Sequence, residues 1–370
     1  MVCPDHSFSL LTTILCGYVM LAICPLGLLG NAIGGIYLVK KLLKTSSFRI
    51  YVAALTLADT GTLLTAILLF IFPRLLQTHE NQYFINVAIK YAYPLACVFQ
   101  TASAWTTCAM TVVRYFSINN PFLIRRVGRF RLAWRFVISI WIGALIFNAP
   151  RFAEVTTVPC FDTTLNATSY YLNATPLRGN FHYKLIYMGV LYACCVFVVP
   201  CALLVILNRA IISRLSRRTG VIAQLMSANP KARDITREAS TQLISSLLTF
   251  ISAIFLICQS LPFLSNVLEI VLTFPALETS YLRHGYSMVT DLGNILVCFN
   301  ASWNFALYLL FNRNFRTTLV EMGDRLRRPK EDGEEDSHYQ LRLMTTLVGR
   351  DLAATKTVPV RCSEPELFGP

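Results

Sequence analysis

Long apolar runs separated by short polar stretches dominate the pattern of this chain. Each of seven such runs is near or above the roughly 20 residues that a helix needs to cross the hydrocarbon core of a bilayer. The runs cover residues 12–39, 49–72, 87–117, 132–149, 185–212, 243–272 and 288–310. The pattern therefore predicts an all-α membrane protein, built as a bundle of seven transmembrane helices.

Composition excludes an ordinary soluble domain. Of the 370 residues, 55% are hydrophobic and 14% are charged, whereas a soluble domain carries about a quarter charged residues. The excess apolar surface has to meet lipid, because in water it would drive aggregation. Residues 1–10 lack the basic start of a signal peptide, so we expect the first apolar run to remain in the mature protein as a span.

Basic residues orient the predicted spans. Clusters of Lys and Arg follow the first, third and fifth runs, whereas the intervening loops carry few basic residues. The positive-inside rule then puts the N-terminus outside and the C-terminus inside a multi-pass protein of the plasma membrane. The clusters are Lys40, Lys41 and Lys44; Arg125, Arg126, Arg129 and Arg131; and Arg214, Arg217, Arg218, Lys231 and Arg233.

Four regions follow from these boundaries. Residues 1–11 form an extracellular N-terminus and residues 12–311 form the seven-transmembrane domain. Residues 312–328 begin with basic and aromatic side chains, which predicts a short amphipathic juxtamembrane helix on the inner leaflet. Residues 329–370 include a strongly charged stretch and are predicted to be a largely disordered cytoplasmic tail.

Glycosylation motifs agree with this topology. Asn166 and Asn173 each begin an Asn-X-Thr motif, and both lie between the fourth and fifth runs, in a loop assigned to the outside. A third motif at Asn300 lies inside the seventh run, where we expect it to stay unmodified.

Charge and cysteine usage exclude several functions. The net charge of +13 comes from short clusters between apolar runs, so no basic domain for nucleic acid is present in the sequence. Most of the 12 cysteines lie within apolar runs, and no spacing of Cys or His suggests zinc. The histidines are scattered outside the spans, so we expect no enzyme. A transporter is a distant alternative, because the sequence has no evident internal repeat.

Polar residues within the spans are costly in lipid and therefore mark candidate functional positions. Asp59 is the only acid in the middle of the second run, and Asn300, Asn304 and Tyr308 share one helix face. An acid beside Ser103 and these asparagines suits a sodium ion, an allosteric modulator, or a water network. Hydrogen bonding that only holds the helices together is an equal alternative. No other cofactor is predicted.

The sequence resembles the rhodopsin-like G-protein-coupled receptors. One motif in each run occurs in the order and at the depth that the family shows, and together they cover residues 31 to 316. The motif residues are Asn31, Leu57-Ala58-Asp59, Arg114-Tyr115, Trp141, Pro200, Pro262 and Asn304-Phe305-Ala306-Leu307-Tyr308. The resemblance implies a heterotrimeric G protein as partner, with Arg114, Tyr115, Pro262, Asn304 and Tyr308 in coupling and activation. Arg114 lies about three turns beyond Ser103, at the cytoplasmic end of its helix.

A narrower resemblance is to the invertebrate FMRFamide-type receptors. It rests on five motifs: Gln100-Thr101-Ala102-Ser103, Asn148-Ala149-Pro150-Arg151-Phe152, Ala174-Thr175-Pro176-Leu177-Arg178, Cys258-Gln259-Ser260-Leu261-Pro262 and Asn300-Ala301-Ser302-Trp303-Asn304-Phe305. It implies an extracellular neuropeptide ligand of the RFamide type. The alternative ligand is a lipid or another small molecule. Membrane lipids are also expected partners, because they surround the spans. The third run has no acid between residues 101 and 105, which argues against an amine.

The resemblance also implies where a peptide binds. The cation of an Arg-Phe-amide ligand needs an acid near the outer ends of the helices, and Asp291, Glu269 and Glu154 are the candidates, with Gln100 beside them. For each of these acids, an equal alternative to ligand binding is that the side chain only solvates the end of its helix.

In the family, a disulfide joins the second extracellular loop to the third helix. Cys160 supplies the loop cysteine, but the position expected for its partner holds Ile89. Cys97 or Cys3 are substitutes, and a free Cys160 is the third alternative.

Three positions depart from the family. Val113 stands where an acid usually holds the following arginine in the resting state, and Gln242 supplies no replacement. Ser260 replaces the usual tryptophan of the sixth helix, and Asn208 replaces a tyrosine of the fifth.

A resting receptor without that acid is expected to signal without ligand. We predict that Val113→Glu lowers basal G-protein signalling, measured by second-messenger accumulation at matched surface expression. Basal signalling that stays the same in this variant would contradict the prediction.

Overall fold

The computed structural model describes residues 3, 9–37, 48–76, 81–120, 130–162, 166–226, 235–274, 279–311 and 320. The chain divides into two compact units, Met1–Phe315 and Arg316–Pro370. The architecture below is that of the first unit. The predicted helix over 312–328 and the tail over 329–370 lie outside the described residues, apart from residue 320.

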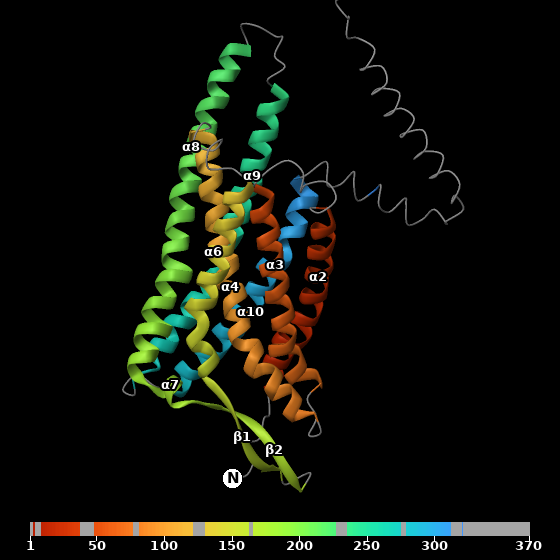
Figure 1. Ribbon diagram of the computed structural model, residues 1–370, viewed down its shortest axis with the longest axis vertical. Helices are drawn as coiled ribbons and strands as arrows, with labels where there is room; N and C mark the ends of the chain where they lie inside the picture. The colour runs from red at the N-terminus through yellow and green to blue at the C-terminus, as the bar shows by residue number, and fades with distance from the viewer. Residues whose placement is uncertain are drawn as a thin grey trace, which may run out of the picture. The chain divides into compact units, whose positions relative to one another are not determined.

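Seven helical rods form most of the described part of the first unit, which confirms the predicted helical fold (Figure 1). Each rod overlaps one of the seven apolar runs. The rods are α1 (Leu10–Thr12) with η1 (Thr13–Val19) and α2 (Met20–Tyr37); α3 (Phe48–Ala66) with η3 (Ile67–Leu76); α4 (Gln82–Asn119); α6 (Phe130–Asn148) with η4 (Ala149–Ala153); η5 (Tyr183–Leu191) and η6 (Ala193–Val198) with α8 (Val199–Met226); α9 (Ile235–Val271); and α10 (Ser280–Phe311).

Length and apolarity alone qualify five of these rods to cross a membrane, among the described residues. The rods formed by α4 and α10 do not qualify. In α4 the polar side chains of Ser103, Thr106 and Thr107 are buried, so this helix directs hydroxyl groups into the bundle. Large apolar side chains such as Leu26, Ile146 and Ile206 are exposed on the outer rods, as expected for surfaces that face lipid.

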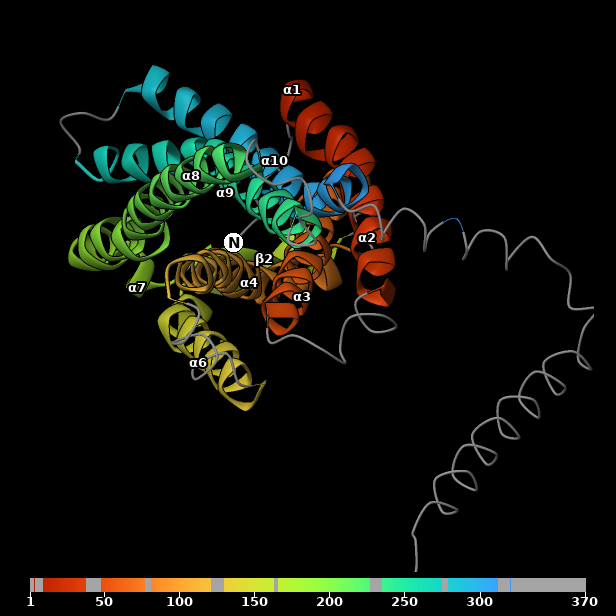
Figure 2. The ribbon, with the colours of Figure 1, turned by 90° about the horizontal axis from the view of Figure 1, so that it is seen from above.

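The packing of the bundle centres on α4. Figure 2 looks along the rods and shows α4 between α3 and α6, and α4 also contacts α8. Burial of Leu55, Met110 and Val137 in one cluster joins α3, α4 and α6. A second cluster, which includes Ala104 and Phe255, joins α4 to the rods of α8 and α9.

A close helix approach occurs at Pro262 of α9. Gly293 of α10 lies against it, and a Cβ atom at position 293 would come within 3.1 Å of the Pro262 nitrogen. Proline inside a helix removes one backbone hydrogen bond and allows a kink. The two helices therefore meet closely at Pro262, where a proline kink can act as a hinge.

A β-hairpin follows the fourth rod, where the sequence predicted only a loop. Its strands are β1 (Val155–Asp162) and β2 (Ala167–Ala174), paired antiparallel from Val155 opposite Ala174 to Asp162 opposite Ala167. The hairpin lies at one end of the rods, which we call the hairpin end (Figure 1). Asn166, with φ of 49°, lies in its turn, and both Asn166 and Asn173 are exposed.

A disulfide bond joins Cys3 to Cys160 of β1. The Cys3 backbone N–H also donates a 3.1 Å hydrogen bond to the carbonyl of Phe161. Cys97 is a buried free thiol. Of the alternatives left open for Cys160, the structure thus selects Cys3, which ties the N-terminal segment to the hairpin.

The disulfide between Cys3 and Cys160 predicts that loss of either cysteine has the same effect on stability. Proteolysis without reduction should release a cross-linked peptide containing Cys3 and Cys160, detected by mass spectrometry. Cys3→Ser and Cys160→Ser should lower the thermal unfolding midpoint of the purified protein by similar amounts, and the double variant by no more. A clear additional loss in the double variant would show that the two thiols act separately.

Candidate functional site

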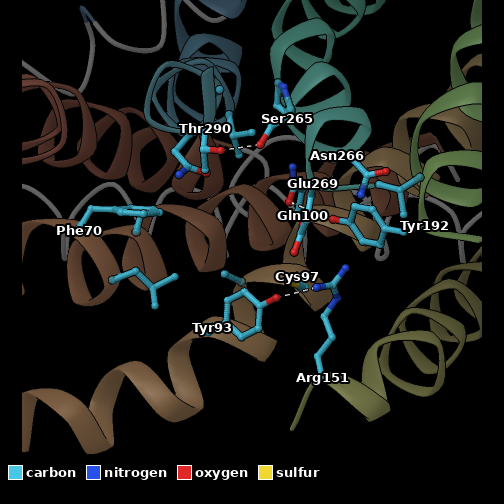
Figure 3. A pocket seen from close by; sticks show the side chains of 18 of the residues that line it. Phe70, Tyr93, Cys97, Gln100, Arg151, Tyr192, Ser265, Asn266, Glu269 and Thr290 are labelled. Carbon is cyan, nitrogen blue, oxygen red and sulfur yellow. Dashed lines mark hydrogen bonds between the residues drawn. The ribbon is translucent and has the colours of Figure 1, made fainter. Parts of the chain in front are cut away.

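A cavity of about 630 Å³ lies between the rods at the hairpin end (Figure 3). This volume is within the range of binding sites for small ligands. Residues of η3, α4, β2, η6, α9 and α10 line it, so helices far apart in sequence form its wall. Apolar side chains include Phe70, Val196, Phe197 and Phe263, and the last two phenylalanine rings stack with centroids 4.1 Å apart.

Amide and hydroxyl groups interrupt this apolar wall. Gln100 of α4 and Asn266 of α9 face the cavity, and Tyr192 donates a 3.4 Å hydrogen bond to Gln100 Oε1. Asn266 Nδ2 donates to the Met188 carbonyl at 2.8 Å, whereas its buried Oδ1 has no hydrogen-bond partner within the described part of the chain. This wall therefore offers both donors and acceptors to a polar ligand.

A buried carboxylate, Glu154, closes the fourth rod beside the cavity. Its side chain is fully buried, and it accepts hydrogen bonds from Tyr93 (3.0 Å), Tyr183 (2.8 Å) and Arg178 (2.8 Å). Arg151 Nη1 lies 3.8 Å from Glu154 Oε1. Because a buried charge is stable only when it is paired and hydrogen-bonded, these donors are what allow Glu154 to be inside the protein.

Arg151 is the second charged group of this network, and it lines the cavity. Its guanidinium lies against the rings of Tyr93, Tyr187 and Tyr192, at 5.8, 5.7 and 4.5 Å from their centroids. It also donates a 2.7 Å hydrogen bond to the Tyr93 hydroxyl (Figure 3). Stacking of a planar guanidinium on aromatic faces stabilises its charge away from water.

Arg178 connects this network to the sixth rod. It lies in the short helix α7 (Pro176–Gly179), and its Nη2 is 3.4 Å from Glu269 Oε1 of α9. Burial disfavours the charged guanidinium, yet Tyr93, Glu269 and Glu154 together raise the pKa of Arg178 above its usual value. The guanidinium therefore stays charged and links two acids from different rods.

The structure separates the four residues predicted for ligand binding. Glu269 and Gln100 line the cavity. Glu154 lies next to it, already bound to its donors. Asp291 lies elsewhere: it accepts a 3.1 Å hydrogen bond from Thr12 and is 3.9 Å from Arg74, so it joins the first, second and seventh rods.

The predicted sodium or water site is brought together in part. Ser103 donates to Asp59 Oδ1 at 2.8 Å, and Asn304 donates to Asp59 Oδ2. Asn300 is half-buried one turn before Asn304 on α10. A carboxylate beside a hydroxyl and amide groups supplies the oxygen ligands that a hard cation prefers. The same contacts also hold α3, α4 and α10 together, so both interpretations still stand as predictions.

The residues predicted for activation are spread along the bundle: Pro262 lines the cavity, whereas Arg114 and Tyr115 lie toward the end of α4 away from the hairpin. Arg114 and Tyr115 of α4 are half-buried, and Val113 packs against the cluster that contains Met110. The side chains of Gln242 and Tyr308 lie outside the described residues. Asn208 is buried in α8, and Ser260 of α9 donates to the Ile257 carbonyl at 2.7 Å.

The sequence did not single out Arg151, Arg178 or Tyr93 as functional residues. Arg151 and Arg178 do occur in motifs of the narrower resemblance, directly after Pro150 and two residues after Pro176, but the motifs alone give them no role. Tyr93 has no sequence signal, because its importance comes from the contacts that its hydroxyl makes with three charged residues.

Comparison with known proteins covers most of the chain. The family described as "Serpentine type 7TM GPCR chemoreceptor Srw" matches residues 18–325. The chain is 28% identical over 311 residues to a probable G-protein coupled receptor, frpr-1, of Caenorhabditis elegans, covering 80% of this chain and 75% of that protein. It is 27% identical over 306 residues to the FMRFamide peptide receptor frpr-18 of the same organism, covering 81% and 67%.

A further relative is the FMRFamide receptor of Drosophila melanogaster, 26% identical over 334 residues. The match covers 88% of this chain but 56% of that receptor, so the chain spans little more than half of its length. These similarities confirm the resemblance to G-protein-coupled receptors and to FMRFamide receptors that the motifs indicated.

The Glu154 network predicts unequal costs for its two acids. Glu154→Gln leaves Arg151 and Arg178 without their buried counter-charge and should cost about 3 kcal/mol or more in stability. Glu269→Gln breaks a partly exposed pair and should cost about 1 kcal/mol or less. Thermal unfolding of the purified variants in detergent measures the difference, and equal midpoints would contradict it.

Proposed function

The chain belongs to the Srw family of serpentine 7TM G-protein-coupled receptors, and on that basis we propose that it is a plasma-membrane receptor for an extracellular peptide of the RFamide type. The cavity at the hairpin end receives the peptide. Binding activates a heterotrimeric G protein at the opposite end of the bundle.

The observation that carries this proposal is the acid Glu269 in the wall of the cavity, beside neutral amide groups. The guanidinium of a peptide arginine pairs with a carboxylate through charge-assisted hydrogen bonds, and neighbouring amides can bond to a peptide backbone and its terminal amide. The phenylalanine-rich part of the wall suits an aromatic side chain. Relatives named as FMRFamide receptors support a ligand of this class.

Two observations support the orientation, with the hairpin end outside. Asn166 and Asn173 are exposed on the hairpin and available for glycosylation. The basic clusters follow the first, third and fifth runs in the sequence, and the described helices of those runs end away from the hairpin (Figure 1), as the positive-inside rule expects for the cytoplasmic side. At that end α8 and α9 extend beyond the neighbouring rods (Figure 1), which offers helix surface to a G protein.

Activation then needs no contact between the peptide and the G protein. A ligand that binds more tightly to the conformation with α9 displaced shifts the population toward it. Because Pro262 lines the cavity on the same helix as Glu269, peptide contacts and the hinge belong to one element.

A lipid or small molecule is the second candidate ligand, because much of the cavity wall is apolar, with Phe70, Phe197 and Phe263 among the residues that line it. Screening amidated peptides in cells that express the receptor with a promiscuous Gα subunit tests the first candidate. We expect responses to FMRFamide-type peptides at micromolar or lower concentrations, and none to the same peptides with a free carboxylate. Responses to lipids alone would favour the second candidate.

Replacing one acid that lines the cavity and one acid outside it locates the binding site in the same assay. Glu269→Gln should weaken the response to an arginine-containing peptide by about tenfold or more, as expected for loss of a charge-assisted pair. Asp291→Asn is the matched acid-to-amide control, because Asp291 lies outside the cavity, and the peptide's potency relative to its citrulline analogue should not change. Equal losses in both variants would contradict this location.

A further inference from the structure

We propose that Arg178 competes with the ligand for Glu269. In the resting receptor Arg178 pairs with the Glu269 carboxylate, and an arginine of the ligand displaces Arg178 from it. The proposal rests on the proposed function, in which Glu269 receives the cation of the peptide. It makes Arg178 a specificity-determining residue and the Arg178–Glu269 pair a latch on the sixth rod.

The fork of the guanidinium makes this arrangement possible. One terminal nitrogen, Nη1, is 2.8 Å from Glu154 Oε2 and 3.1 Å from the Tyr93 hydroxyl. The other, Nη2, is 3.4 Å from Glu269 Oε1. Arg178 therefore holds one acid with each arm of the fork, a geometry that a single ammonium group cannot reproduce.

The two arms differ in strength. Glu154 is fully buried and bound at a short distance, whereas the side chains of Arg178 and Glu269 are 28% and 26% exposed. Partly exposed ion pairs at longer distance contribute little, while a buried carboxylate cannot lose its donors cheaply. The contact with Glu269 is thus the one that yields first, and Arg178 keeps Glu154 and Tyr93 when it does.

Arg178 is also fixed relative to the fourth rod. Thr175, the residue before α7, donates from its hydroxyl to the Ala153 carbonyl at 2.6 Å and from its backbone N–H to the Glu154 carbonyl at 2.9 Å. Glu269 lies on α9, seven residues after Pro262. The pair therefore fastens the segment of α9 beyond its hinge to a fixed point at the hairpin end.

Displacement of Arg178 from Glu269 couples recognition of the ligand to release of α9. A guanidinium supplied by the peptide satisfies Glu269 and removes the constraint on α9 in one step. A ligand without a cation leaves the Arg178–Glu269 pair in place, because nothing competes for the carboxylate. The latch thus selects for cationic ligands and disfavours the active conformation when none is bound.

Arg178→Lys tests this mechanism without removing charge. Lysine can pair with Glu154, yet its single nitrogen does not also reach Glu269. Arg283→Lys, a replacement of the same kind on an exposed side chain of α10, is the matched control. We would measure the Kd of FMRFamide and of its neutral analogue with citrulline in place of arginine, together with basal G-protein signalling at equal surface expression.

Arg178→Lys should tighten FMRFamide binding about two- to fivefold, the range of a partly exposed ion pair, and leave the citrulline analogue unchanged. Basal signalling should rise in both Arg178→Lys and Glu269→Gln. In the Glu269→Gln background, Arg178→Lys should change neither the Kd of FMRFamide nor basal signalling, because the Arg178–Glu269 pair is already broken. The control should match the unmodified receptor.

The outcomes separate the latch from the proposed function. If Glu269→Gln weakens FMRFamide but Arg178→Lys changes neither affinity nor basal signalling, the latch is wrong and the peptide site stands. If Glu269→Gln leaves FMRFamide binding intact, the peptide site is wrong, and the latch survives only if both single variants raise basal signalling without adding in the double variant. An effect of Arg178→Lys that persists in the Glu269→Gln background also overturns the latch.

Discussion

Polar groups inside the bundle have to find their partners within the protein, because the surrounding hydrocarbon offers none. For its buried acids, the described structure meets this constraint with clusters that each join rods distant in sequence. Asp59 binds Ser103 and Asn304, Glu154 binds two tyrosines and two arginines, and Asp291 contacts Thr12 and Arg74. These clusters fix the relative positions of the rods more specifically than apolar packing does, since apolar contacts have no direction.

The same constraint explains what the sequence could predict. The number of spans follows from apolar run length, and Asp59 stands out because an acid is rare in the middle of a span. Its pairing with Ser103 and Asn304 also follows from helix depth, since all three lie near the middle of their spans. These features depend only on where residues lie along the chain, so they can be predicted from the sequence.

Other parts depend on which side chains meet in three dimensions. Asp291 and Glu269 both lie near the hairpin end of their helices, but rotation about the helix axis directs Glu269 toward the cavity and Asp291 toward Arg74. Two polar strands with many threonines and tyrosines gave no clear alternation, so the hairpin read as a loop. The role of Tyr93 depends on residues 58 and 85 positions away, Arg151 and Arg178.

The disulfide between Cys3 and Cys160 has a consequence for how the chain is made. Its two cysteines are separated by 157 residues, and the loop it closes contains the first four rods. In the proposed orientation, with the hairpin end outside, Cys3 enters an oxidising compartment before Cys160, because Cys3 precedes the first rod in the chain and Cys160 follows the fourth. The bond of Cys3 to Cys160 can therefore form only after four rods are made, and closure of this covalent ring marks the point at which the first half of the bundle is assembled.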